Sequence, residues 1–200
     1  MKHLSLILIT LAITAGITAQ EKVKQSEIGL VFNNLNNFGV GFKVGSNKFK
    51  WRFNTMLLSS STNKLTNDST NTETESKRSG FGVSIGHQFQ KPISENFEFL
   101  FGYDFFYNST KSKYDDGQEL TYYVQKYRNP GFNIVLAFNY IFKEHLLIGA
   151  EILPYVSWSK TITEREYKYV SSTPFSTSEN KRFSYGLTNT SVRLNLAYRF

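Results

Sequence analysis

Large apolar side chains recur at every second position along most of this chain, and this pattern constrains its fold most strongly. Alternation with period two is typical of a strand that has two unlike faces. On one face of the final segment lie Val192, Leu194, Leu196, Tyr198 and Phe200. Eight such segments predict strands at 26–33, 38–45, 48–60, 79–90, 97–109, 131–142, 146–160 and 185–200. The chain is therefore expected to be all-β.

The connections between these segments alternate in length. Short links occur at 35–37, 46–47, 91–96 and 143–145, and long polar loops are expected at 61–78, 110–130 and 161–184. In an up-and-down barrel, odd-numbered connections share one rim and even-numbered connections share the other. Long loops at one rim and tight turns at the other are typical of membrane barrels. The pattern predicts an eight-stranded antiparallel up-and-down transmembrane β-barrel.

Glycine indicates which face is the interior. Ten glycines lie opposite the bulky apolar side chains: Gly29, Gly39, Gly41, Gly45, Gly80, Gly82, Gly86, Gly102, Gly131 and Gly149. Gly186 breaks this parity. A narrow eight-stranded barrel has little interior room, so small residues belong inside and aromatic residues outside. So continuous an apolar outer face would aggregate in water, so we expect lipid to cover it. A soluble sandwich with core aromatics is the alternative, but it leaves the glycine parity unexplained.

Charged residues fall on the predicted inner face. They are Glu27, Lys43, Lys50, Arg52, Glu98, Asp104, Glu151 and Arg193, with Arg199 as a ninth candidate. Burying these charges singly costs too much free energy, so we expect an ion-pair and hydrogen-bond network that plugs the lumen. A small polar channel lined by the same charges is the alternative.

Aromatic residues near both ends of the strands suit the two membrane interfaces. The expected short-turn group is Phe49, Trp51, Phe89, Phe97, Phe142, Tyr198 and Phe200. The expected long-loop group is Phe32, Phe38, Phe81, Phe105, Tyr107, Phe132 and Trp158.

The chain begins with an apolar run, residues 4–17, that follows Lys2 and ends in small residues. This predicts a secretory signal peptide at 1–19 and a barrel domain at 20–200. A membrane anchor is the alternative, but the run is shorter than the roughly 20 residues that span a bilayer. Removing residues 1–19 leaves 22 basic and 16 acidic residues, a net charge of +6, without a basic cluster. Nucleic acid is therefore not an expected partner. The absence of Cys excludes disulfides and thiolate metal sites.

The terminal Tyr198-Arg199-Phe200, together with the alternating strand before it, resembles bacterial outer-membrane barrels. The chain looks most like the small outer membrane protein beta-barrel domain family common in Bacteroidota, and architecturally like OmpA transmembrane domains and OmpX. The resemblance implies an outer-membrane location. It also implies that Tyr198 and Phe200 form an assembly signal read by the barrel-assembly machinery.

Catalysis on such a barrel requires a His near a Ser and a carboxylate at the outer rim. His87 is expected near the short-turn end and His145 within a short turn, so neither suits this role. We expect no catalytic residue, cofactor or metal site. The sequence predicts a non-enzymatic outer-membrane barrel, surrounded by lipid, whose long loops serve envelope stability, adhesion or recognition. The alternatives are a narrow porin for small solutes and a lipid A-modifying enzyme.

Overall fold

The computed structural model describes residues 24–34, 37–67, 72–115, 122–166, 176–188 and 191–200. The predicted signal peptide, 1–19, lies outside the described residues. The described ranges form ten strands: β1 (Gln25–Asn34), β2 (Asn37–Gly45), β3 (Phe49–Asn67), β4 (Thr72–Pro92), β5 (Phe97–Asp115), β6 (Tyr122–Phe142), β7 (Leu146–Ile152), β8 (Tyr155–Glu166), β9 (Ser176–Gly186) and β10 (Val192–Arg199).

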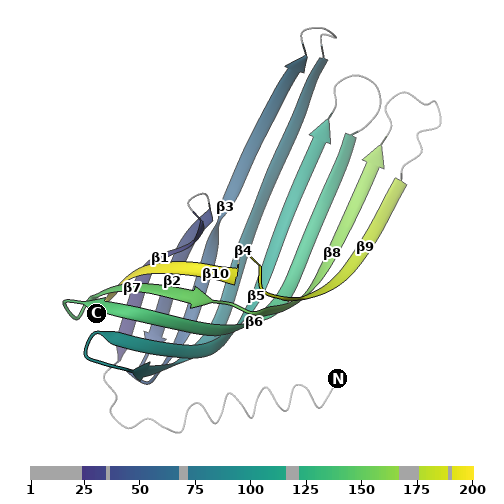
Figure 1. Ribbon diagram of the computed structural model, residues 1–200. Coiled ribbons are helices and arrows are strands. Elements are labelled where there is room, and N and C mark those ends of the chain that lie inside the picture. Colours follow the sequence, from purple (N-terminus) through teal and green to yellow (C-terminus); the bar gives the residue numbers. More distant parts are fainter. Residues whose placement is uncertain (1–23, 35–36, 68–71, 116–121, 167–175, 189–190) are drawn as a thin grey trace.

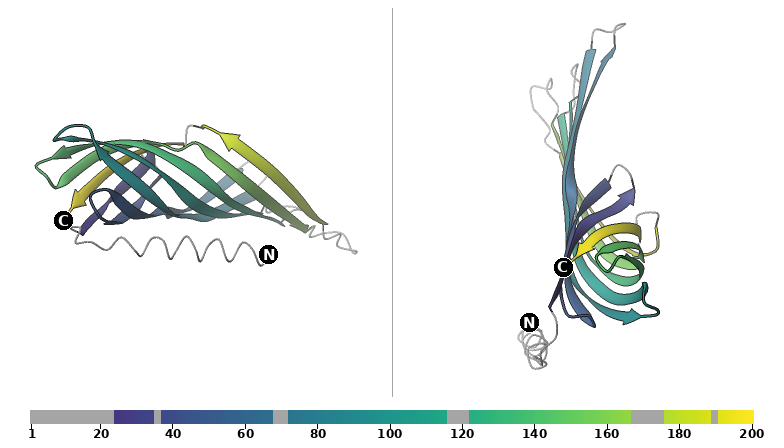
Figure 2. Two further views of the ribbon diagram at one scale, coloured as in Figure 1. Left: turned by 90° about the horizontal axis from the view of Figure 1, so that it is seen from below. Right: turned by 90° about the vertical axis from the view of Figure 1, so that its left-hand side faces the viewer.

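Eight of these strands close into a barrel in the order β1-β2-β3-β4-β5-β6-β7-β10. Each strand is antiparallel to its neighbours, and the ring closes where β1 pairs with β10, from Glu27 opposite Arg199 to Phe32 opposite Leu194. Figure 2 shows the strands curling around one another at the end where the C-terminus lies. The predicted eight-stranded antiparallel barrel is confirmed.

Strands β8 and β9 continue the seventh and eighth predicted strands beyond this ring. Pro154 separates β7 from β8, and the register against β6 is unchanged across it, because Leu136 faces Ile152 and Asn133 faces Tyr155. Proline lacks the N–H that the ladder needs, which explains the interruption. The one strand predicted over 185–200 is instead divided, because β9 ends at Gly186 and β10 begins at Val192.

The described parts of the three predicted long loops are strand instead. The β3–β4 ladder continues to Asn67 opposite Thr72, and the β5–β6 ladder continues to Asp115 opposite Tyr122. The β8–β9 ladder likewise continues to Arg165 opposite Ser176. These segments have polar residues on both faces, so hydrophobic alternation cannot reveal them. Thr and Tyr nevertheless favour strands, and cross-strand pairs stabilise the sheet.

These continuations form a single tall sheet, seen at the upper right of Figure 1. We call it the extended sheet; it comprises residues 59–67, 72–80, 108–115, 122–130, 155–166 and 176–186. Within the described pairings, residues 59–67 of β3 bond only to β4, and β9 bonds only to β8. The extended sheet is therefore open, with two free edges, while the barrel beneath it is closed.

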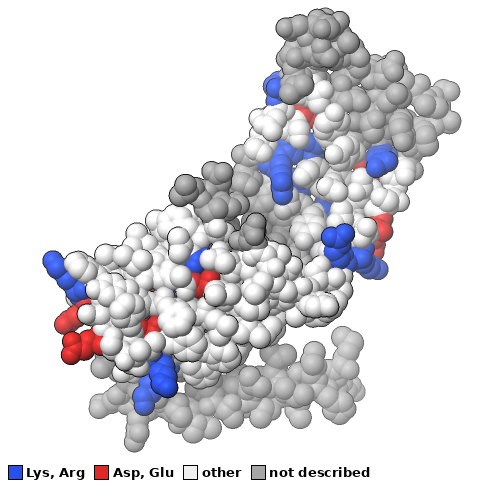
Figure 3. All heavy atoms as spheres, viewed as in Figure 1, with Lys and Arg blue, Asp and Glu red and all other residues white. Residues whose placement is uncertain are grey.

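The outer surface of the barrel is apolar. Phe138 and Leu194, for example, are 55% and 58% exposed, and aromatic or aliphatic side chains cover this face of every barrel strand. In the space-filling view, the middle of the barrel is mostly free of charged atoms, whereas charges gather at the short-turn end and on the extended sheet (Figure 3). Among the described residues, no helix is long and apolar enough to cross a membrane.

The turn between β6 and β7 holds two residues in the left-handed region of backbone conformation. Lys143 has a φ of 49° and Glu144 a φ of 66°. An L-residue there costs about 1–2 kcal/mol, because its Cβ approaches the following carbonyl. We expect Glu144→Gly to raise the free energy of unfolding by about 0.5–1 kcal/mol, since glycine adopts this conformation without that cost. Urea unfolding in lipid vesicles measures the change. Glu144→Ala is the control, and an equal gain in that variant would show that the effect comes from removing charge.

Candidate functional site

Four charged side chains meet inside the short-turn end of the barrel. The Arg199 guanidinium lies between two carboxylates, with Nε donating to Glu27 Oε1 at 2.9 Å and Nη1 donating to Glu98 Oε1 at 2.9 Å. Lys50 Nζ donates to the same Glu27 oxygen, and the Gln90 amide donates to Glu98. Two cations and two anions make this group neutral. We call Glu27, Lys50, Glu98 and Arg199 the lower cluster.

A second group lies directly above it, centred on Arg52. Arg52 Nε is 2.9 Å from Asp104 Oδ1, and Nη2 donates to Glu151 Oε2 at 2.7 Å. Its remaining nitrogen, Nη1, donates to Gln88 Oε1 at 3.1 Å. Lys43 Nζ lies 3.7 Å from Glu151 Oε1. Arg52, Asp104 and Glu151 are completely buried. We call Lys43, Arg52, Asp104 and Glu151 the upper cluster, and it too is neutral.

The structure places all nine charged residues of the predicted network inside the barrel, and each is buried. It brings eight of them together in the two clusters. Arg193 stands apart, and its Nε donates to Asn33 Oδ1 at 3.1 Å. Glu151, which faces Arg193 across the β7–β10 ladder, is already paired with Arg52 and Lys43.

Sequence reasoning missed the uncharged part of the interior. Gln88 and Gln90 are buried and hydrogen-bonded within the clusters. A small apolar cluster is also buried, made of Leu100, Val135, Ala137 and Leu153. Gln88, Gln90 and Leu100 share the inward parity of the charged residues, so the same alternation identifies them as inner residues.

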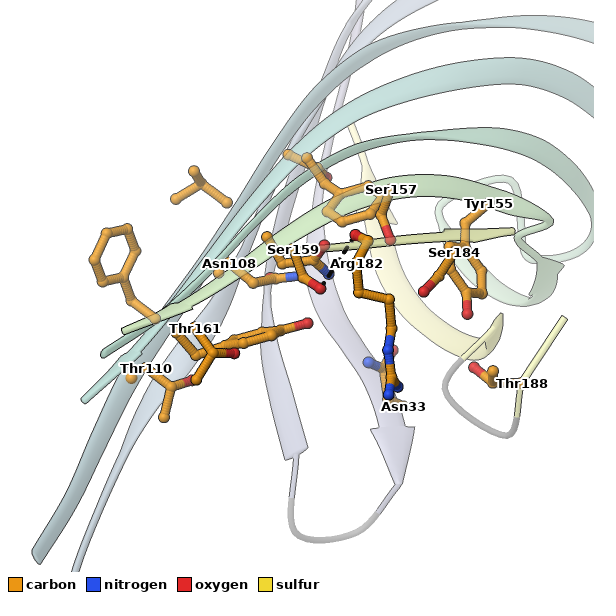
Figure 4. Close-up of a pocket in the computed structure, with 18 of the residues that line it drawn as sticks. Asn33, Asn108, Thr110, Tyr155, Ser157, Ser159, Thr161, Arg182, Ser184 and Thr188 are labelled. Carbon is orange, nitrogen blue, oxygen red and sulfur yellow. Dashed lines mark hydrogen bonds between the residues drawn. The ribbon is translucent and has the colours of Figure 1, made fainter. Parts of the chain in front are cut away.

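A cavity of about 1010 Å³ opens above the upper cluster. Its floor includes Asn54, Phe106 and Leu153. These residues follow Arg52, Asp104 and Glu151 by two positions in the sequence, so they lie on the same inward face. Its walls are the concave face of the extended sheet, with β8 contributing Tyr155, Ser157, Ser159, Thr161 and Thr163. Figure 4 shows Tyr155, Ser157, Ser159 and Thr161 directed into the cavity, together with Arg182 from β9. Hydroxyl and amide groups therefore dominate the lining.

The convex face of the extended sheet carries mixed charges. Glu179 on β9 accepts from Lys160 at 2.7 Å and from Lys181 at 3.0 Å. These hydrogen bonds hold the pKa of the Glu179 carboxyl below its usual value. On the neighbouring strands, Lys126 pairs with Glu164 at 2.6 Å. Toward the ends of the hairpins this face is exposed and ion-paired, and nearer the barrel it carries Trp158, Phe183 and Tyr185.

The two histidines of the barrel contact aromatic rings. His87 lies on the outer face among Phe49, Trp51, Phe89 and Tyr103, at ring-centroid distances of 4.3–6.1 Å. His145 stacks on Tyr198 at 5.3 Å, and its Nδ1 lies 2.9 Å from the Arg199 carbonyl oxygen. Tyr198 in turn stacks on Phe200 at 6.5 Å, so the two residues of the predicted assembly signal lie together on the outer face.

Within the described part of the chain, no group of three or more His, Cys, Asp or Glu residues is arranged to hold a metal ion.

The fold has a counterpart among solved structures. A major outer membrane protein from Thermus thermophilus superposes with a TM-score of 0.54 and 13% sequence identity, covering 89% of this chain and 100% of that chain. At this identity the likeness shows the fold alone. The KdgM porin, solved in complex with disordered oligogalacturonate, aligns over 88% of this chain and 98% of that chain at 10% identity, but its TM-score of 0.18 carries no argument. No protein-family model and no curated protein sequence matches this chain.

Proposed function

We propose that this chain is a non-enzymatic integral outer-membrane barrel with a plugged lumen, and that its extended sheet presents a recognition surface outside the membrane. This proposal rests on the distribution of apolar and charged residues, which is the opposite of that in a soluble protein. Aromatic and aliphatic side chains cover the outside of the barrel, while the charged residues of its wall are buried inside. Such a protein is stable only where lipid covers its outer face.

The two neutral clusters support a plugged lumen. Eight strands enclose little more than their own side chains, and Arg52 reaches from β3 to partners on β4, β5 and β7. Ions crossing the barrel would have to displace these buried pairs, which costs several kcal/mol per unpaired charge.

The extended sheet supports a role in recognition, adhesion or envelope stability. Binding residues are commonly held by a rigid scaffold, and here the closed barrel anchors three long hairpins that line one cavity. The same proposal makes Tyr198 and Phe200 the signal for the barrel-assembly machinery, and their exposed positions on the outer face leave them accessible to a partner.

Heat-modifiable mobility tests the membrane assignment. We expect unboiled protein, purified in detergent, to migrate differently from boiled protein in SDS gels, because a closed barrel resists SDS until heated. A mature protein that stays soluble without detergent and shows no mobility shift would contradict the assignment.

Planar-bilayer recording tests the plug. We expect no stable single-channel openings from the wild-type protein, with a general porin in the same bilayer as the positive control. Reproducible openings of the wild type would instead favour the narrow porin.

A further inference from the structure

Arg193 is the one charged residue of the predicted inner network that lies outside the two neutral clusters. Arg193 is 7% exposed, and its Nη1 is buried without a hydrogen-bond partner. Its hydrogen-bond partner Asn33 is neutral, and Glu151, which faces Arg193 across the β7–β10 ladder, is already paired with Arg52 and Lys43. A buried donor left unsatisfied destabilises the fold, and the cost is larger when the group is charged. Because Arg193 and Asn33 both line the cavity, the unmatched positive charge lies at the cavity wall.

Two further arginines line the same cavity. Arg78 is contributed by β4 and Arg182 by β9. Figure 4 shows Arg182 extending from its strand into the space between Ser157, Ser184 and Asn33. Among the described residues that line the cavity, none is Asp or Glu. Three guanidinium groups therefore surround a space whose described lining supplies no anion.

The rest of the lining indicates the class of ligand. Guanidinium groups bind carboxylate or sulfate in a bidentate manner. Most other lining side chains carry hydroxyl or amide groups, which suit the many donors and acceptors of a polyol. Tyr127, Tyr155 and Phe106 add aromatic surface against which a sugar ring packs. An acidic peptide would use the guanidinium groups but would leave most of these hydroxyls without a matching group.

We propose that this cavity binds an acidic oligosaccharide, with Arg78, Arg182 and Arg193 engaging its carboxylate or sulfate groups. This rests on the proposed function, because it names the ligand class of the recognition surface. Arg193 supplies the buried charge at the barrel wall, and Arg182 supplies a second charge from the free edge strand. The hydroxyls of β8 bind the part of the sugar that lies between these two charges.

The test uses the full chain in phosphatidylcholine nanodiscs, which contain no glycolipid. The probes are a dextran sulfate oligosaccharide, an alginate oligosaccharide and a neutral dextran of the same length. We expect both acidic probes to bind at least about tenfold more tightly than neutral dextran, with affinity falling as salt is raised. Equal binding of neutral and acidic sugars, or no binding of either acidic probe, would overturn the proposal. A poly-glutamate peptide that bound as tightly as the acidic sugars would overturn the assignment to saccharides.

Matched variants separate the cavity from net charge. Arg182→Gln and Arg193→Gln should each weaken binding of dextran sulfate by about tenfold. Lys160→Gln and Lys181→Gln remove the same charge from the convex face, and they should leave binding unchanged. Equal losses in both sets would mean that general electrostatic attraction, and not the cavity, is responsible. Arg193→Lys keeps the charge and should retain more binding than Arg193→Gln.

Separate measurements report on folding, on the plugged lumen and on sugar binding. Heat-modifiable mobility shows whether each variant is folded, and Arg182 serves as the decisive position if Arg193→Gln does not fold. Bilayer recording reports on the plug alone. A closed barrel that binds no acidic sugar would therefore refute this inference while leaving the proposed function intact.

Discussion

Arg52→Met is expected to lower the free energy of unfolding by about 3–5 kcal/mol. The substitution removes the side chain that contacts both Asp104 and Glu151, and it leaves two carboxylates buried in the barrel. Lys43, at 3.7 Å from Glu151, compensates only one of them. Urea unfolding of the protein folded in lipid vesicles measures the loss.

Two further variants test whether this loss of stability comes from breaking the buried ion pairs. Lys126→Met breaks a surface pair with Glu164 and should cost less than about 1 kcal/mol, because solvent screens it. Arg52→Met combined with Glu151→Gln removes one cation and one anion, and it should recover part of the loss through their coupling. If the double variant were as unstable as the sum of the single variants, the buried ion pair would not be the reason for the effect.

Gly86→Ala is expected to destabilise the barrel by about 3 kcal/mol or to prevent its folding. A Cβ at Gly86 would lie 1.9 Å from the Tyr103 carbonyl oxygen and 2.2 Å from Asp104 Oδ1. The nearest atom belongs to the backbone of β5, which cannot move without breaking the β4–β5 ladder. The yield of the heat-modifiable form and urea unfolding both report this effect.

Gly41→Ala is the matched control, since Gly41 also faces the interior. A Cβ there meets Asn54 Oδ1 at 3.0 Å and Val31 Cγ1 at 3.4 Å, and both atoms belong to side chains. We expect a change below about 1 kcal/mol. Comparable losses at both positions would indicate that any added volume in the interior is harmful, and would contradict the specific clash at Gly86.

The barrel was predictable because its two faces differ so strongly. Alternation located the strands that enter the ring, and glycine on the face opposite the aromatics indicated which face is inside. Both features come from one physical requirement, a narrow interior surrounded by lipid. Each charged residue predicted to face inward, such as Arg52 or Glu151, is buried in the structure for the same reason.

The extended sheet and its cavity were not predictable in this way. Where both faces of a strand are polar, as along residues 161–166, periodicity carries no signal, and β-propensity and pairing decide the structure. The pairing of Arg193 with Asn33, 160 residues apart, depends on ring closure between β1 and β10. Arg182 joins the same cavity only because β9 follows β8 beyond the ring.

The free edge of β9 bears on self-association. An unpaired strand edge is a template on which another molecule adds its own strand, and repeated addition leads to aggregates. Charged side chains act against such growth, and β9 carries Glu179, Lys181 and Arg182 close together along its exposed length. A second copy docking on this edge would have to desolvate these groups. The sequence of β9 therefore opposes polymerisation at the place where the sheet is left open.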